Sequence, residues 1–308
     1  MAKPSAVEIP AAFRARAASQ AHWSDWFADL PALLETLLTE WELRPDGSTL
    51  SGYCAVVVPV SMIDGRAAVL KVGWPHWEAE YEHLALRAWD GDGAIRLFRA
   101  DPRRFALLLE RADASRDLNS LPVLDACERI AELYPRLHRP ALPQLKRLSD
   151  LCVDWSGRLP KLAASGLMPR RLVAQALSSL RELSGGAEID AALIHTDLHF
   201  FNVLGAEREN WLAIDPKPLA GDPAYEVAPL LWNRWEEAHA TGNLRQALLA
   251  KMFTMIDAAG LDEDRVRAWI LIREVLNAMW DYENSLLGAT LDKDWITRST
   301  TIAKAVQK

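Results

Sequence analysis

The sequence predicts an α+β protein with a small β-rich N-terminal lobe and a larger, mainly helical C-terminal lobe. Strand-like segments are concentrated between residues 52 and 110, and almost everything after residue 113 has helical periodicity. The exception is a pair of short apolar runs around residues 191–198 and 211–215. We expect one domain over residues 1–111, comprising an N-terminal helix and the β-rich lobe, and a second over residues 112–308.

The N-terminal lobe begins with an apolar helical pattern from Trp26 to Trp41, which ends at Pro45, Asp46 and Gly47. Two strand-like runs, residues 52–63 and 66–72, follow on either side of an Asp-Gly turn and predict a hairpin. Pro59 favours an edge position for the first strand. A helix from Pro75 to Trp89 and two further strands, residues 94–100 and 104–110, complete the predicted lobe.

Five helices are predicted in the C-terminal lobe from apolar periodicity. They cover residues 121–137, 170–183, 223–240, 244–259 and 263–284. The two short apolar runs between the second and third helix predict strands, separated by a polar turn at residues 207–210. Asp222 precedes a helical segment and is expected to be its N-cap.

Composition limits the classes of function. The 308 residues carry 35 basic and 42 acidic side chains, a net charge of −7, which argues against nucleic acid and anionic membrane as partners. A cationic or neutral small molecule fits better. The three cysteines have no CxxC spacing, and no segment has the length and hydropathy of a signal peptide or membrane span, so a cytoplasmic protein is expected. The oligomeric state stays open.

The most informative segment is HTDLHFFNVLGAERENWLAID, residues 195–215, where acid and amide side chains recur beside predicted strand ends. Asn202 and Asp215 offer the hard oxygen ligands that suit a nucleotide-bound magnesium ion. Asp197 remains as a carboxylate that could orient an attacking hydroxyl and accept its proton. His195 and His199 are expected to be structural hydrogen-bonding residues of this loop.

These residues resemble a known family. HTDLHFFN matches the HxDxxxxN catalytic loop of the aminoglycoside phosphotransferases, which have a bilobal protein-kinase-like fold, and the string IDPKPLAGDPAYEVAPLLWNRW is most similar to the streptomycin 6-kinase and hydroxyurea phosphotransferase branch. The resemblance implies ATP, or GTP, with Mg²⁺. It makes Asp197 the catalytic base and Asn202 and Asp215 the metal ligands. Lys217, near the predicted metal site, is either a phosphate contact or a solvated lysine.

A kinase of this type needs a strand lysine paired with a helix glutamate to hold the phosphates. Lys71 lies in an apolar strand, where an unpaired ammonium group would be costly. Glu78 and Glu82 do not lie on the polar face of the following helix but project among its apolar residues, where a carboxylate is explained if it meets a cation such as Lys71. Similarity to the family favours Glu82 over Glu78.

The nucleotide base and the phosphate-covering loop are less well defined. The strand ending at Glu110, with Arg111 and Ala112 after it, resembles the segment whose backbone binds the purine, so Glu110 and Ala112 are assigned to the nucleotide. Instead of a GxGxxG loop the chain has SGYCA around Gly52, with Ser48, Thr49 and Ser51 as candidate hydroxyl donors.

For the acceptor, Glu274, Asn277, Asp281 and Asn284 share one arc of the helix at residues 263–284, with Asp281 as the first candidate. This polar stripe either faces a cleft, where it would attract guanidinium or ammonium groups, or is an ordinary solvent-exposed face.

Phosphorylation of an aminoglycoside hydroxyl, with streptomycin as the first candidate, is therefore the leading hypothesis. A kinase of the same fold acting on a sugar, another antibiotic or another hydroxylated metabolite is the alternative. Two other classes remain: a catalytically silent nucleotide-binding module, and a zinc hydrolase that would use His195, Asp197 and His199 as metal ligands.

Overall fold

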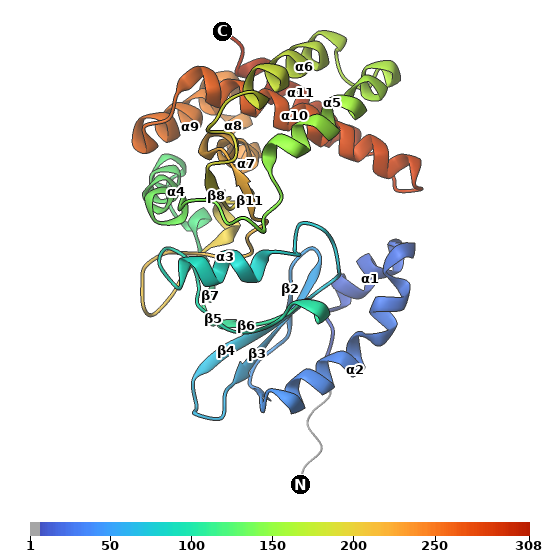
Figure 1. The fold of residues 1–308 in the computed structure, drawn as a ribbon, viewed down its shortest axis with the longest axis vertical. Helices are drawn as coiled ribbons and strands as arrows, with labels where there is room; N and C mark the ends of the chain where they lie inside the picture. The colour runs from blue at the N-terminus through green and yellow to red at the C-terminus, as the bar shows by residue number, and fades with distance from the viewer. Residues whose placement is uncertain (1–6) are drawn as a thin grey trace. The chain divides into compact units, whose positions relative to one another are not determined.

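The computed structural model describes residues 7–308, which form two compact units (Figure 1). The first contains the described residues up to Asp113 together with Ala206–Leu212, and the second contains Ala114–Gly205 and Ala213–Lys308. Residues 1–6, part of the predicted first domain, lie outside the described range. The predicted division at residues 111 and 112 did not include the short return to the first unit. There Arg208 donates hydrogen bonds to the Glu110 carboxylate and to the Ala94 carbonyl oxygen.

The sheet of the first unit has the order β1-β3-β4-β6-β5, with β2 also paired to β3. The hairpin predicted around Asp64 and Gly65 is β3 and β4, which pair antiparallel. Pro59 is in β3, which is not an edge strand as predicted. Its outer neighbours β1 and β2 are only two residues long and pair with other residues of β3, so neither needs a donor from the proline nitrogen. The strands are β1(Arg44–Pro45), β2(Leu50–Ser51), β3(Ala55–Ser61), β4(Ala67–Gly73), β5(Leu97–Asp101) and β6(Ala106–Glu110).

Strand alternation gives the sheet two different faces. Val58, Leu70 and Leu108 point into a core with the N-terminal helices α1(Ala11–Ser19) and α2(Ser24–Glu40), which are joined by the short helix η1(Ala21–Trp23). Lys71, one residue after Leu70, therefore points to the opposite face. The predicted helix at residues 26–41 is confirmed as α2, whereas the sequence did not indicate α1 as a separate helix.

Helix α3(Glu82–Trp89) begins seven residues later than predicted from Pro75. Residues 77–81 form turns, in which Ala79 donates to the His76 carbonyl and Glu82 donates to the Ala79 carbonyl. The end at Trp89 was predicted correctly and is followed by Asp90 in a left-handed conformation.

The second unit contains two small sheets. One has the order β10-β9-β7, and the other pairs β11 with β8. The two runs predicted as strands are β8 and β10, and they pair with different partners rather than with each other. The strands are β7(Asp113–Asp117), β8(Ala192–Ile194), β9(Val203–Gly205), β10(Leu212–Ala213) and β11(Leu219–Gly221), with the short helices η3(Leu118–Ser120), η4(Phe200–Asn202) and η5(Pro223–Val227).

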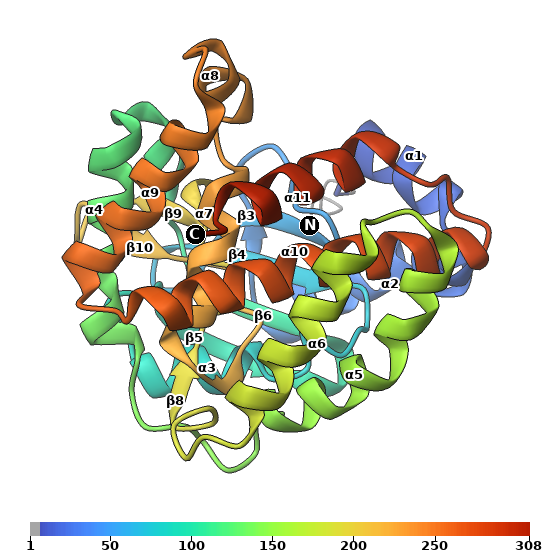
Figure 2. The same ribbon diagram turned by 90° about the horizontal axis from the view of Figure 1, so that it is seen from above.

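Helix α10(Glu263–Leu286) runs through the middle of the second unit and packs against α5, α6 and α11 (Figure 2). Predictions for α4, α6, α9 and α10 are confirmed. The segment predicted as one helix at residues 223–240 is instead η5, α7 and α8, because the chain leaves helical geometry at Asn233 and Arg234. The remaining bounds are η2(Pro102–Arg104), α4(Val123–Leu137), α5(Leu148–Ser165), α6(Arg170–Ser184), α7(Ala228–Trp232), α8(Trp235–Ala240), α9(Leu244–Ala259) and α11(Lys293–Ala305).

Among the described residues, no helix combines the length and hydropathy needed to cross a membrane.

Candidate active site

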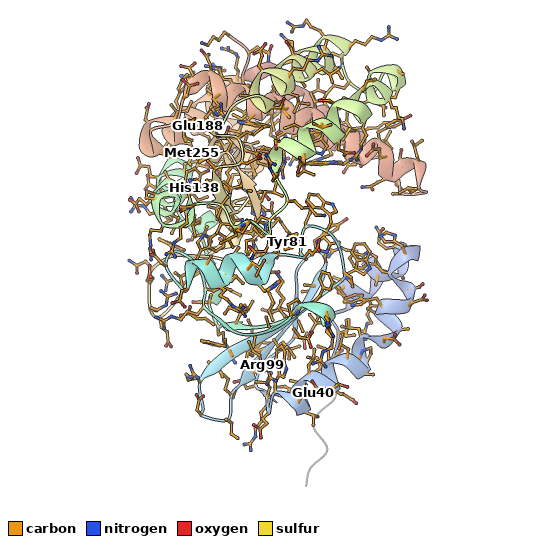
Figure 3. All side chains as sticks on the ribbon, viewed as in Figure 1. Glu40, Tyr81, Arg99, His138, Glu188 and Met255 are labelled. Atoms are coloured by element: carbon orange, nitrogen blue, oxygen red, sulfur yellow. The ribbon has the colours of Figure 1, made fainter. Side chains whose placement is uncertain are left out.

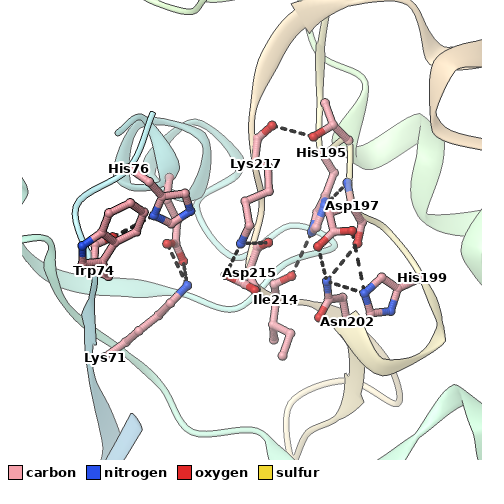
Figure 4. Close-up of polar contacts among 12 residues, drawn as sticks. Lys71, Trp74, His76, His195, Asp197, His199, Asn202, Ile214, Asp215 and Lys217 are labelled. Atoms are coloured by element: carbon pink, nitrogen blue, oxygen red, sulfur yellow. Dashed lines mark hydrogen bonds and ion pairs between the residues drawn. The ribbon is translucent and has the colours of Figure 1, made fainter. Parts of the chain in front are cut away.

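The predicted catalytic loop leaves β8 at Ile194 and ends in the short helix η4. Its first residue, His195, is fully buried and anchors the loop through both ring nitrogens (Figure 4). Nε2 lies 2.9 Å from the Ile214 carbonyl oxygen and must carry the proton, while Nδ1 accepts from the Asp197 N–H at 3.3 Å. Burial lowers the pKa of His195 and outweighs the nearby carboxylates, so the ring is neutral.

This geometry is incompatible with the zinc-hydrolase alternative. Both nitrogens of His195 are occupied by backbone groups, so this side chain cannot be a metal ligand. Within the described part of the chain, no three His, Cys, Asp or Glu side chains are grouped so that they could hold a metal ion. The expected structural role of His195 is confirmed.

The residue before Asp197 has an unusual backbone. Thr196 has a φ of 63°, in the left-handed region that is unfavourable for a β-branched residue. Its N–H donates to Glu226 Oε1 at 2.6 Å, and its hydroxyl donates to the Lys217 carbonyl oxygen at 2.7 Å. These bonds hold Thr196 in this conformation, and the conformation sets the direction of Asp197.

Asp197 is in contact with the predicted metal ligand Asn202. The Asn202 Nδ2 lies 2.9 Å from the Asp197 carbonyl oxygen and 3.2 Å from Asp197 Oδ2. It is also 3.2 Å from His199 Nε2, which lies 3.7 Å from Asp197 Oδ1. Because the side-chain nitrogen Nδ2 of Asn202 faces Asp197, the side-chain oxygen Oδ1 of Asn202 faces away from Asp197 and is oriented as an acceptor. The Asp197 side chain retains 26% of its exposure, so the carboxylate can reach a substrate.

A backbone hydrogen bond brings Asp215 close to Asn202: the N–H of Ile214, the residue before Asp215, donates to the backbone carbonyl oxygen of Asn202 at 2.9 Å. Asp215 has a φ of 57°, so it also has the left-handed conformation that sets side-chain direction at special sites. Its Oδ1 accepts from Lys217 Nζ at 2.7 Å. Lys217 is thus an ion-pair partner of Asp215, and the solvated alternative for this lysine is wrong.

Asn202 and Asp215 together fit a magnesium ion. They present one amide oxygen and one carboxylate, which are hard ligands. Magnesium in nucleotide sites takes one or two protein ligands and completes its shell with phosphates and water.

A buried set of polar groups behind the loop was not predicted. Glu226 is fully buried, and its Oε2 accepts from His138 Nε2 at 2.5 Å; His138 is labelled in Figure 3. Burial alone would raise the pKa of Glu226, but the His138 ring and the Thr196 N–H outweigh it and lower the pKa. The Phe200 N–H donates to Asn233 Oδ1 at 3.0 Å. In the sequence, Glu226 stood out only as the last residue of the GDPAYE string, residues 221–226. Nothing in the sequence indicated that His138 would contact it.

Asp222, in the same string, is confirmed as an N-cap. It accepts from the Ala224 N–H at 3.0 Å and is also bound by Arg265 and Trp269 Nε1.

In the first unit, Lys71 and Glu82 form the predicted ion pair (Figure 4). Lys71 Nζ lies 2.6 Å from Glu82 Oε1 and 2.7 Å from Oε2, and the two side chains are only 13% and 5% exposed. The open choice between Glu78 and Glu82 is thereby decided in favour of Glu82, the first residue of α3. Glu78 lies in the preceding turns.

Glu110 ends β6, and Ala112 follows in the connection to β7. The Glu110 N–H donates to the Arg96 carbonyl oxygen at 2.9 Å. Its carboxylate accepts from Arg208 Nη2 and from the Arg96 N–H, both at 2.9 Å. Burial raises the pKa of Glu110, but these donors outweigh it and lower the pKa. The side chain is engaged within its own unit, so any role in purine binding would fall to the backbone of Glu110 and Ala112.

The predicted acceptor stripe on α10 is not a surface feature at two of its four positions. Glu274 is fully buried and accepts from Trp232 Nε1 at 2.6 Å, and Asn277 is 6% exposed. Burial raises the pKa of Glu274 to about 7. The expectation of a solvent-facing or cleft-facing stripe is therefore wrong for both residues, because α10 is enclosed by neighbouring helices. Asp281 is partly exposed and accepts from the Asp292 N–H at 3.0 Å.

A family model described as "Aminoglycoside/hydroxyurea antibiotic resistance kinase" matches residues 40–285. The chain belongs to this family. It is a small-molecule kinase with a protein-kinase-like fold, as the catalytic-loop resemblance predicted.

Two individual relatives support membership of this family. A streptomycin 6-kinase from Streptomyces glaucescens is 40% identical over 96% of this chain and 97% of its own length. A hydroxyurea phosphotransferase from Kitasatospora aureofaciens is also 40% identical, over 83% of this chain and 74% of its own.

Solved structures share the fold at low identity. The aminoglycoside phosphotransferase APH(4)-Ia, in a ternary complex with ADP and hygromycin B, has a TM-score of 0.56 at 18% identity and covers 88% of this chain and 96% of its own. The choline kinase LicA from Streptococcus pneumoniae has a TM-score of 0.59 at 14% identity and covers 89% and 97%.

Proposed function

We propose that this kinase transfers the γ-phosphoryl group of ATP to a hydroxyl group of an aminoglycoside, with streptomycin as the first candidate. The observation that carries the proposal is that Asp197, Asn202 and Asp215 are brought together. The Asn202 side-chain amide donates to Asp197, and the Ile214 N–H, next to Asp215, donates to the backbone carbonyl oxygen of Asn202. The streptomycin 6-kinase that aligns along nearly the whole chain supports this acceptor. A cytoplasmic location belongs to the same proposal, since the reaction consumes ATP.

The nucleotide would be bound by groups of the first unit. The Lys71 ammonium, held by Glu82 at 2.6 Å, would contact the phosphates, and the backbone of Glu110 and Ala112 would contact the purine. The ADP complex of APH(4)-Ia and the GDP complex of APH(2")-IIia support a nucleotide in this fold, with either purine.

Asn202 and Asp215 would hold magnesium, which neutralises phosphate charge when bound. Lys217, paired with Asp215 at 2.7 Å, fixes the direction of that carboxylate from the side. Thr196, which precedes Asp197, and Asp215 both have a left-handed backbone conformation. These conformations place the carboxylates of Asp197 and Asp215 on short turns.

The transfer itself requires little from the protein beyond alignment and one proton acceptor. The acceptor oxygen forms a bond to the γ-phosphorus while the bond between that phosphorus and the β–γ bridging oxygen breaks, and ADP leaves with the bridging oxygen. The hydroxyl proton passes to the Asp197 carboxylate, which also contacts the Asn202 side-chain amide and the His199 ring.

A second acceptor has specific support. The 40% identity to a hydroxyurea phosphotransferase supports hydroxyurea as an alternative acceptor.

The test is an acceptor panel of streptomycin, other aminoglycosides, hydroxyurea and simple sugars with Mg²⁺ and ATP or GTP, read by phosphorus NMR. We expect a new phosphoester with streptomycin. Asp197→Asn should lower kcat by at least about a thousandfold while nucleotide binding is retained. Asp257→Asn makes the same change at an exposed position of α9 and should have full activity. If only hydroxyurea gives a product, hydroxyurea replaces streptomycin as the proposed acceptor. If Asp197→Asn retains activity, the assignment of Asp197 as the catalytic base is wrong.

A further inference from the structure

In the proposed nucleotide site, the loop between β2 and β3 would cover the phosphates, yet it lacks a glycine-rich sequence. It comprises Gly52, Tyr53 and Cys54. The Gly52 N–H donates to the Ala55 carbonyl oxygen at 2.9 Å, and the Cys54 carbonyl oxygen accepts from the Trp74 N–H at 2.7 Å. Trp74 is three residues beyond Lys71 on the same chain segment, so this bond ties the loop to the end of the strand that carries the lysine.

A third restraint comes from the N-terminal helix α1, which contacts this loop in the first unit (Figure 1). Arg16 Nη1 donates to the carbonyl oxygens of both Gly52 and Tyr53, each at 3.0 Å. The guanidinium carbon also lies 4.6 Å from the centre of the Tyr53 ring, within the range of a cation–π contact.

The base of this contact is fixed. Phe13 and Ala17, which flank Arg16 on α1, are 0% and 4% exposed in the core of the first unit. The Tyr53 side chain is 68% exposed, so little besides Arg16 packs against it. Residues 40–285 contain the match to the family, so Arg16 lies outside the segment that defines it.

We propose that Arg16 is a positioning residue for the nucleotide: it holds the phosphate-covering loop in a phosphate-binding conformation in place of a glycine-rich sequence. The inference rests on the proposed nucleotide site in the first unit. It adds a residue from the N-terminal helix to that site without placing this residue in contact with the nucleotide.

The geometry of the peptide bond explains how. In a trans peptide the C=O and the following N–H point in opposite directions. Since the Gly52 and Tyr53 carbonyls point at Arg16, the N–H groups of Tyr53 and Cys54 are directed to the other side of the loop. Two successive amides pointing one way form an anion-binding concavity. The Arg16 guanidinium also holds the Gly52 and Tyr53 carbonyl oxygens by hydrogen bonds. These oxygens would otherwise be able to turn toward the phosphates and repel them.

Arg16→Ala should therefore weaken the binding of phosphates and leave the binding of the nucleoside part unchanged. We expect the KM for ATP and the Kd of ATP to rise about tenfold, which corresponds to about 1.4 kcal/mol. The Kd of AMP, which lacks the β and γ phosphates, should change by less than about twofold. Arg16→Lys keeps the charge but loses the planar geometry and should be intermediate. Arg14→Ala removes an exposed arginine from the same helix and is the matched control.

Hydrogen exchange supplies a readout independent of catalysis. In Arg16→Ala the amides of residues 52–54 should exchange faster, while those of α1 and β4 match Arg14→Ala. If Arg16→Ala and Arg14→Ala share one ATP affinity, or if AMP and ATP weaken equally, the positioning role is refuted. If exchange rises throughout α1 as well, Arg16 is a general stabilising residue and the proposal also fails. Failure of the wild-type protein to phosphorylate streptomycin would overturn the acceptor and leave these nucleotide comparisons intact.

Discussion

Lys251 on α9 gives the sharpest quantitative prediction. Its side chain is 1% exposed, and its Nζ donates to the Asn233 carbonyl oxygen. Burial lowers the pKa of Lys251 to about 8, well below the ordinary value for a lysine; the Arg234 cation adds to the lowering and the Glu237 carboxylate opposes it. Asn233 in turn holds Phe200 of the catalytic loop, so the buried ammonium group supports the site indirectly.

The energetic consequence follows from linkage. At pH 7 Lys251 is protonated in both the folded and the unfolded protein, and the fall of its pKa from about 10.4 to about 8 corresponds to about 3 kcal/mol of lost stability. Between pH 8 and 10.5 the folded protein has released this proton while the unfolded chain still binds it. Stability from this group therefore rises with pH through that window. The Cys127 thiol, with its pKa raised by burial to about 12, stays protonated throughout.

Lys251→Met removes the buried charge but leaves the Asn233 carbonyl oxygen unsatisfied, which costs about 1 to 3 kcal/mol. At pH 7 the variant should thus be as stable as the wild type, or more stable by up to about 2 kcal/mol. At pH 10.5 it should be less stable by about 1 to 3 kcal/mol.

Urea unfolding at several pH values from 7 to 10.5 measures this crossover. Lys161→Met, at an exposed position of α5, shows how far the loss of any lysine changes the profile. If the stability difference between Lys251→Met and the wild type is constant across this range, the lowered pKa and the reasoning built on it are wrong.

The other predictions concern buried carboxylates of the second unit. Glu226→Ala leaves the Thr196 N–H and His138 without an acceptor and should cost about 3 to 5 kcal/mol in denaturant unfolding, together with a fall in kcat. Glu226→Gln should cost less and should flatten the loss of stability that the wild type shows as pH falls through the lowered pKa of Glu226; equal costs for both variants would contradict this role. For Glu274, with its pKa raised to about 7 by burial, stability should fall by about 3 kcal/mol as pH rises from 4.5 to 7, and Glu274→Gln should abolish that fall in the same assay.

Local sequence patterns predicted much of the fold and the core of the site. Alternation along β4 places Lys71 on the face opposite Leu70, and helical periodicity located α2, α4, α6, α9 and α10. The spacing of Asp197, Asn202 and Asp215 predicted the chemistry, because Asp197 and Asn202 lie in one short segment and Asp215 follows the strand β10 that returns to it. Such features depend on neighbours within a few residues, so a single sequence contains them.

Contacts between distant segments could not be predicted in this way. His138 and Glu226 are 88 residues apart, and Arg16 meets Gly52 from a helix that the sequence did not distinguish. Periodicity shows that Glu274 and Asn277 share a face of α10 but not how many helices surround that face, and the structure buries both. The sequence by itself therefore predicted which groups would carry out the proposed reaction. The tertiary structure decided which groups hold them in place, because a buried charge or a strained turn is stabilised by whatever chain segment packs against it.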